Sequence, residues 1–172
     1  MQKKFSYPLK IDELNQNQYK FEINADQDEL ADIAAILKVE KAKQFMAEIY
    51  IKRNVKEHIL KVWGTVKAQL LLKSVISLEN FLQEYDVPFT LTYDTIATYQ
   101  DIKEMEAGIN DEVPDIIENG EINLADIALE QIALNMDDYP RAKGEVFDFN
   151  QYVVQEEISK ENPFAVLQKL KK

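Results

Sequence analysis

The chain of 172 residues has no cysteine, one histidine and four glycines. Without cysteine, disulfide bonds and thiolate metal sites are excluded. The four glycines lie far apart, so the sequence contains neither a phosphate-binding loop nor a dinucleotide-binding fingerprint. The longest apolar runs, such as Leu70 to Leu72, are too short to span a bilayer. The lack of a long apolar run favours a soluble protein, and 172 residues fit about one domain.

The sequence also shows no recognisable motif for acid–base or nucleophilic catalysis. The single histidine, His58, lies among charged residues and is typical of an exposed position. No Gly-x-Ser-x-Gly elbow is present, and the carboxylate pair Asp137-Asp138 falls in a predicted loop, where solvated charge is the default. We therefore expect no enzyme, no metal, no cofactor and no small-molecule substrate. Because no apolar segment follows the two N-terminal lysines, we expect a cytoplasmic protein without membrane contact.

Basic residues are few, and they are unevenly distributed along the chain. The net charge is −11, yet residues 38–73 hold nine basic and three acidic side chains, whereas residues 79–138 hold sixteen acidic and one basic. A net negative charge argues against general affinity for nucleic acid. The division suggests two faces with different partners, although a solvated, loop-rich acidic half would give the same pattern.

Period-two alternation of apolar and polar residues dominates the first half of the chain. It predicts half-buried strands near Tyr19 to Ile23, near Phe45 to Lys52 and, as the longest pattern, from Leu60 to Leu72. Gly64 is expected to mark a bulge or bend in that longest strand. Further strands are predicted for residues 5–11, 80–85 and 89–93, with Pro88 at a sheet edge or a bulge.

Helix signals occur at three places. Asp26 with Glu29 forms a capping-box pattern that begins an N-terminal helix, and Asn123 begins a helix that is apolar on more than one side. Pro163 is suited to the first position of a short C-terminal helix. The predicted fold is α+β, an antiparallel sheet or open barrel with a buried central helix, in a single domain over 1–172. An acidic segment near 101–119 is expected to be a mobile loop, and residues 155–162 to be flexible.

One surface stands out as a candidate binding site. If the two longest strands pair, basic and aromatic side chains emerge together on their polar face, as in surfaces that bind RNA by base stacking and phosphate contact. The alternative is an ordinary sheet face on which a helix covers the tryptophan. The candidate residues are Tyr50, Lys52, Lys61, Trp63 and Lys67.

Several segments, in order, resemble the YceD-like family of bacterial large ribosomal RNA subunit accumulation proteins. The resemblance covers roughly residues 40–172, and the family's Cys-x-x-Cys is replaced here by Ser74 and Ser77. The matching segments are the long strand ending at Leu72 with Lys73 to Ser77 and Phe81, Glu118 to Leu124, the residues Glu130, Ile132, Leu134 and Pro140, and Asn162 to Leu167 with its lysine tail.

The resemblance implies a non-enzymatic role in synthesis, processing or stability of large-subunit (23S) ribosomal RNA. The expected partners are that RNA or a basic ribosomal protein. The alternative is a protein-interaction module without RNA contact, whose C-terminal helix docks into a partner's groove. The same helix would otherwise pack on its own sheet. The residues of this C-terminal motif are Asn162, Pro163, Phe164, Leu167 and Leu170.

Overall fold

The computed structural model describes residues 5–96 and 115–147. Two compact units divide the chain, Met1–Ala142 and Lys143–Lys172, and every helix and strand named here belongs to the first. This division does not test the predicted single domain, which stays a prediction. The elements are β1 (Pro8–Lys10), the 3-10 turn η1 (Ile11–Glu13), β2 (Gln18–Asn24), α1 (Gln27–Leu37), β3 (Lys41–Asn54), β4 (Ile59–Lys73), β5 (Asn80–Asp94), β6 (Asp115–Ile116), η2 (Glu118–Gly120), β7 (Glu121–Asn123) and α3 (Leu124–Asn135).

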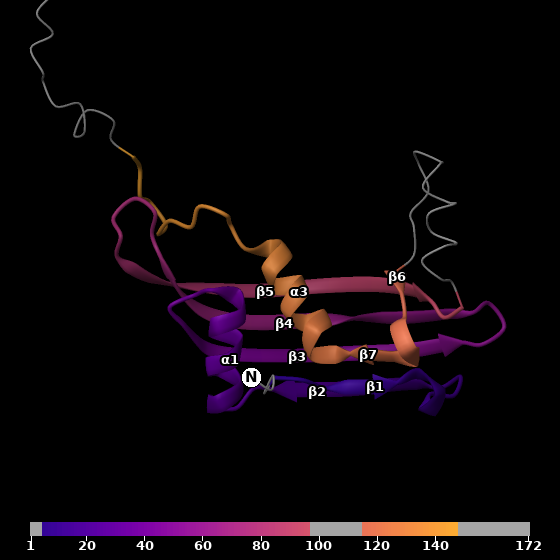
Figure 1. The fold of residues 1–172 in the computed structure, drawn as a ribbon. Helices are drawn as coiled ribbons and strands as arrows, with labels where there is room; N and C mark the ends of the chain where they lie inside the picture. The colour runs from indigo at the N-terminus through magenta and orange to yellow at the C-terminus, as the bar shows by residue number, and fades with distance from the viewer. Residues whose placement is uncertain (1–4, 97–114, 148–172) are drawn as a thin grey trace, which may run out of the picture. The chain divides into compact units, whose positions relative to one another are not determined.

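A five-stranded sheet in the order β2-β3-β4-β5-β6 forms the body of this unit (Figure 1). Strands β2 to β5 are a meander in which each strand is antiparallel to the next, whereas the short β6 runs parallel to the end of β5. A separate two-stranded sheet joins β1 to β7. The α+β class is confirmed, and of the two predicted architectures the described strands form an open sheet.

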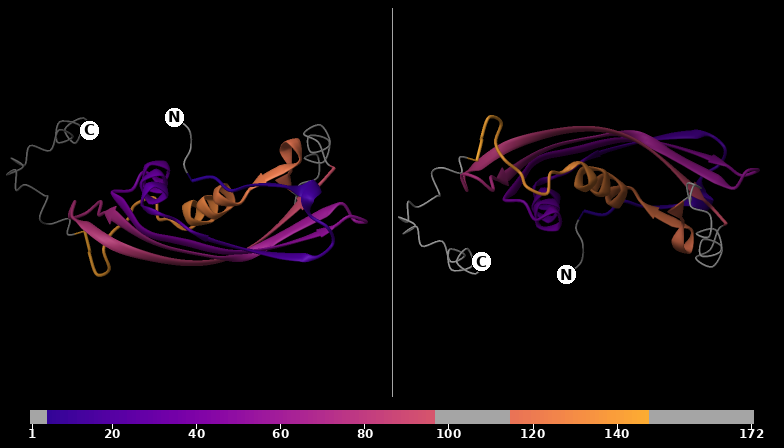
Figure 2. Two further views of the ribbon diagram at one scale, coloured as in Figure 1. Left: turned by 90° about the horizontal axis from the view of Figure 1, so that it is seen from below. Right: turned by 90° about the horizontal axis from the view of Figure 1, so that it is seen from above.

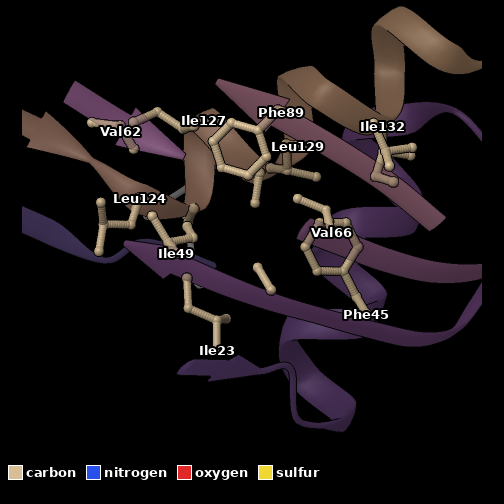
Figure 3. Packing of buried hydrophobic residues seen from close by; sticks show 14 of the residues in the cluster. Ile23, Phe45, Ile49, Val62, Val66, Phe89, Leu124, Ile127, Leu129 and Ile132 are labelled. Carbon is tan, nitrogen blue, oxygen red and sulfur yellow. The ribbon is translucent and has the colours of Figure 1, made fainter. Parts of the chain in front are cut away.

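Both helices and the β1–β7 ribbon lie on one side of the curved sheet, the concave side (Figure 2). Helix α1 contacts β3, and α3 contacts β4 and β5. Every second residue of the central strands points to this side of the sheet, and these side chains fill the space between the sheet and the helices. The buried side chains that Figure 3 shows include Phe45, Ile49, Val62, Val66, Phe89, Leu124, Ile127, Leu129 and Ile132.

Gly64 lies on the core side of β4, opposite Ile49 of β3 and Phe89 of β5. The predicted bulge at this position is wrong, because the pairing passes through Gly64 without a shift and the register slips instead between Ala42 and Gln44. A β-carbon at Gly64 would lie 1.9 Å from the carbonyl oxygen of Glu48. Glycine is therefore required here by the close approach of two backbones.

Strand β5 runs unbroken from Asn80 to Asp94, so the two separate strands predicted for this region are wrong. The predicted edge position of Pro88 is confirmed, since on the side of β5 away from β4 the short β6 pairs only with Tyr93 and Asp94 and no described strand lies beside the rest. Proline is tolerated at an edge because no neighbouring strand needs its N–H. The strand therefore continues through Pro88.

Two other predicted boundaries differ from the structure. The predicted strand over residues 5–11 contains only the three residues of β1, and a 3-10 turn begins at Ile11. The last residues of the predicted loop 101–119 form β6 and the beginning of η2. The loop's mobility is not tested, because residues 97–114 lie outside the described part of the chain.

Two predicted helix starts, at Asp26 and Asn123, are confirmed, whereas the one at Pro163 lies outside the described residues. Asp26 accepts hydrogen bonds from the amides of Asp28 and Glu29, and the Glu29 carboxylate accepts one from the Asp26 amide, which completes the capping box. Asn123 caps α3 by accepting from the Ala125 amide. Helix α3 buries seven residues, namely Leu124, Ala125, Ile127, Ala128, Leu129, Gln131 and Ile132.

Tyr7 joins the two helices through segments that are far apart in the sequence. Its amide donates to the side-chain oxygen of Asn123 at 2.9 Å, and its carbonyl accepts from the Leu124 amide at 3.0 Å. Its hydroxyl donates to the Glu29 carboxylate at 2.8 Å. Burial and this hydrogen bond raise the pKa of Tyr7 to about 12, so the hydroxyl stays a donor at neutral pH. The start of the chain thus holds α1 and α3 over the sheet.

Candidate functional site

The convex face of the sheet is covered by no described helix (Figure 2). In the pairing of β3 with β4, Tyr50 lies opposite Trp63 and Lys52 lies opposite Lys61. These four residues occupy two adjacent rows of the open face and form what we call the basic–aromatic block. The strand pairing places these four residues side by side, and their role as a binding site stays a prediction. The alternative of a helix over Trp63 finds no support, since both described helices lie on the other side of the sheet.

The two aromatic rings of the block stack on each other. Their centroids are 5.8 Å apart, and their planes differ by 17°. The Lys61 ammonium lies 5.9 Å from the centroid of the Trp63 ring, within the range of a cation–π contact. Lys20 of β2 approaches the Tyr50 ring from the other side of β3 at 5.8 Å. Basic and aromatic side chains are therefore in direct contact across three strands.

Lys20 is held by two carboxylates. Its ammonium lies 2.6 Å from Glu22 and 2.8 Å from Glu48, and these contacts, first the one with Glu22, raise the pKa of Lys20. Glu48 also accepts a hydrogen bond from the Tyr50 hydroxyl at 2.8 Å. The Lys20 and Tyr50 contacts lower the pKa of Glu48, whereas the bond to Glu48 raises that of Tyr50. This network holds the Tyr50 hydroxyl, and the two carboxylates compensate the positive charge of Lys20.

The fifth predicted residue, Lys67, shares the open face but lies outside the block. It pairs with Met46 of β3, two rows beyond the row of Trp63. Its ammonium forms an ion pair with Asp86 of β5 at 3.3 Å. Lys52 and Lys61, by contrast, form no ion pair with any residue in the described ranges. The uncompensated positive charge of the block comes from these two lysines.

The sequence did not predict three residues of this surface, and the strand register places them beside the block. Lys20 lies opposite Tyr50, Thr90 of β5 lies opposite Trp63, and Thr92 lies opposite Lys61. The alternation of Lys20 with Tyr19 and Phe21 indicated its outward direction. Nothing in the sequence indicated which strand β2 would pair with, or in which register.

The charge division along the sequence does not become a division between the two faces of the sheet. The open face also carries the acidic residues Glu22, Glu48, Glu84 and Asp86, of which Asp86 lies directly opposite Lys67. The helical side is more uniform, since α1 holds three acidic residues, α3 holds two, and neither helix holds a basic one. The interpretation of two oppositely charged faces is therefore too simple.

A groove lies between the C-terminal ends of α1 and α3. Its volume is about 380 Å³, and its floor includes Ile36, Leu129 and Met136. Three carboxylates line its rim, from Glu130, Asp137 and Asp138. Within the described ranges none of these carboxylates forms an ion pair. The groove thus combines an apolar floor with unneutralised negative charge.

Other candidate residues add no reactive site. His58 is an exposed turn residue with a positive φ of 56°, and its carbonyl accepts from the Thr95 amide and hydroxyl. No group of three or more His, Cys, Asp or Glu side chains in the described part of the chain is placed to hold a metal ion.

No helix within residues 5–96 and 115–147 has the length and apolar character needed to cross a membrane. The predicted C-terminal motif, residues 162–170, lies outside the described residues.

These observations define an α+β protein in which one sheet face, covered by no helix of residues 5–96 and 115–147, carries a stacked aromatic pair and two lysines without an ion pair in those ranges. The model of the family "Large ribosomal RNA subunit accumulation protein YceD" matches residues 62–171, which is more than half of the chain. The chain belongs to the YceD family, as the resemblance in its sequence indicated. No curated protein sequence and no solved structure matches it.

Ser74 has a structural role at the position where the sequence resemblance places a cysteine. The residue is buried directly after β4, and its hydroxyl oxygen accepts from the amides of Ile76 and Ser77 at 3.1 and 3.3 Å. The amide of Val75 donates to the Pro140 carbonyl at 2.9 Å. A serine therefore holds this turn through hydrogen bonds to its backbone.

Proposed function

We propose that this protein acts in the accumulation of large-subunit ribosomal RNA as a non-enzymatic binding factor, and that the basic–aromatic block contacts the RNA. The family match supports the ribosomal role. The observation that carries the RNA contact is the pairing of Lys52 with Lys61 beside the Tyr50–Trp63 stack on an uncovered face. Lysines neutralise phosphates, and aromatic rings stack on bases, so the block offers both elements of RNA recognition.

The surrounding carboxylates support a confined contact. With a net charge of −11, the protein as a whole repels RNA at long range. Two adjacent uncompensated lysines overcome this repulsion only locally. Association is therefore expected to depend on these two residues far more than on the other lysines of the open face.

Replacing both Lys52 and Lys61 by glutamate is expected to lower association with precursor large-subunit particles by at least about tenfold, because two phosphate contacts become repulsive. The measurement is co-sedimentation of the variant with these particles in sucrose gradients. The Lys67→Glu variant is the matched control, since Lys67 belongs to the same strand and face but is compensated by Asp86. It should retain most of the association.

Co-sedimentation of the Lys52→Glu/Lys61→Glu protein at the level of the unaltered protein would rule out the block as the RNA contact. An equal loss in the Lys67→Glu variant would attribute association to overall charge rather than to the block. Circular dichroism and thermal unfolding should match among all three proteins, since these side chains are exposed.

A second candidate is contact with a basic ribosomal protein at the groove between α1 and α3. Its apolar floor and the free carboxylates Glu130, Asp137 and Asp138 complement a segment that has both lysines and apolar side chains. Ile36 in the groove is 41% exposed and Leu134 of α3 is 72% exposed, and exposed apolar side chains of this kind favour a contact rather than a solvated surface.

Zero-length carboxyl-to-amine crosslinking of the purified precursor particles tests this contact. We expect crosslinks from Glu130 or Asp137 to lysines of one large-subunit ribosomal protein, identified by mass spectrometry. A Glu130→Lys/Asp137→Lys variant should lose that protein from the particle, whereas Glu121→Lys, an exposed acid on β7, should keep it. Crosslinks spread equally over all exposed carboxylates would exclude a specific site.

A further inference from the structure

The ring of Trp63 has one face that no other aromatic ring covers among the described residues. Tyr50 stacks on it from β3, on one side of β4. On the other side, the residue in register is Thr90 of β5, which is small and exposed. Neighbouring strands are about 5 Å apart, so the space above Thr90 lies beside the ring face that Tyr50 does not cover, which we call the free face. The Lys61 ammonium lies 5.9 Å from the centroid of the same ring.

This space is open toward the edge of the sheet. On the outer side of β5 no described strand lies beside Thr90, because β6 pairs only with Tyr93 and Asp94. Lys61, opposite Thr92 in the adjacent row, places an exposed ammonium next to the same space, and Lys52 follows on β3. A planar ligand group stacked on Trp63 would therefore lie near the Lys61 and Lys52 ammonium groups. The rest of the ligand could extend from it across the open face.

The charge around the block excludes a duplex as the preferred ligand. A duplex presents one phosphate for roughly every 1.7 Å of its axis, and its phosphates must be met by many cations. On this face, Lys20 and Lys67 are already paired with carboxylates, and Glu22, Glu48 and Asp86 lie within one or two rows of the block. Within the two rows of the block only Lys52 and Lys61 remain for phosphates, enough for a short stretch of one strand.

We infer that the block binds an unpaired nucleobase of single-stranded RNA, stacked on the free face of Trp63 above Thr90, with Lys52 and Lys61 on the adjacent phosphates. The inference rests on the proposed RNA contact and specifies its ligand. Stacking on an aromatic ring tolerates every base, so the site selects unpaired RNA rather than a sequence.

The test uses the full chain and a fluorescently labelled oligouridine of about ten nucleotides, within the usual size of single-strand sites, against a duplex of equal length. We expect the oligouridine to bind and to quench the fluorescence of Trp63, which is the only tryptophan in the chain. The duplex should bind at least about tenfold more weakly. Fluorescence anisotropy of the RNA gives the affinities.

Substitutions at Thr90 test the space beside the free face of Trp63. Thr90→Tyr fills the space with a ring while keeping every lysine and Trp63, and it should lower the affinity for oligouridine by about tenfold. Thr90→Val, of the same size as threonine, should leave the affinity unchanged. If Thr90→Tyr fails to fold, Trp63→Leu against Trp63→Phe gives the same comparison, with loss expected only for leucine.

The outcomes separate the two proposals. Equal affinity for single strand and duplex, or full affinity in the Thr90→Tyr protein, overturns the stacked-base inference. The proposed RNA contact still stands in that case if the Lys52→Glu/Lys61→Glu protein loses RNA binding. Failure of the unaltered protein to bind either RNA and to co-sediment with precursor particles overturns the proposed function as well.

Discussion

A Gly64→Ala substitution is expected to destabilise the protein by about 3 kcal/mol or more, at the upper end of what overpacking a core costs. The added β-carbon would lie 1.9 Å from the Glu48 carbonyl oxygen and 3.1 Å from the α-carbon of Ile49. Both are backbone atoms of a paired strand, so no side-chain rotation relieves the contact. Because a domain is stable by only about 5–15 kcal/mol, this loss is a large part of the total.

Chemical denaturation measures this effect as a lower midpoint with an unchanged slope. Thr65→Ala, one residue further on the same strand, is the matched control, since Thr65 points to the open face and has no core contact to lose. Its cost should stay within about 1 kcal/mol, as for most surface substitutions. A Gly64→Ala protein as stable as the Thr65→Ala protein would refute the close approach of β3 and β4.

Phe45→Ala is expected to cost about 3–5 kcal/mol, the usual range for removing a buried phenylalanine. The Phe45 side chain is 1% exposed, and its ring meets that of Phe5 edge-to-face, with centroids 5.3 Å apart. The substitution leaves a cavity where β3, α1 and the N-terminal segment meet, and it removes this aromatic contact.

The thermal unfolding temperature and the denaturation midpoint both report this loss. Phe45→Leu should cost clearly less, because leucine fills most of the same volume. A Phe45→Ala protein within about 1 kcal/mol of the original would mean that the N-terminal segment does not close over the sheet. Phe5, which is fully buried, would then have to lie elsewhere.

The sequence was most informative where one short-range rule decided the structure. The alternation along residues 45–52 and 60–72 predicted β3 and β4 and the common face of Tyr50 and Trp63, because a strand has a period of two. Asp26 and Glu29 predicted the start of α1, since a capping box involves only four consecutive residues. For the same reason Asn123 marked the start of α3.

Features set by distant partners could not be predicted. Pairing of Tyr50 with Lys20, and of Trp63 with Thr90, depends on the register between strands, which no local pattern encodes. The ion pair of Lys67 with Asp86 has the same origin, and it removed one of the five candidate residues from the block. Pro88 was predicted at an edge or a bulge, but local sequence did not show that one strand continues through it from Asn80 to Asp94.

The hydrogen bonds of Tyr7 have a consequence for the order of folding. The Tyr7 amide finds its acceptor in Asn123, 116 residues later, whereas strands β2 to β5 pair with immediate neighbours in the chain. During synthesis the meander can form as its strands emerge, but the N-terminal segment waits for β7 and α3. Closure of long loops is slow compared with hairpin formation, so the helical layer is expected to settle last. Until then the concave side of the sheet stays exposed to chaperones and to aggregation.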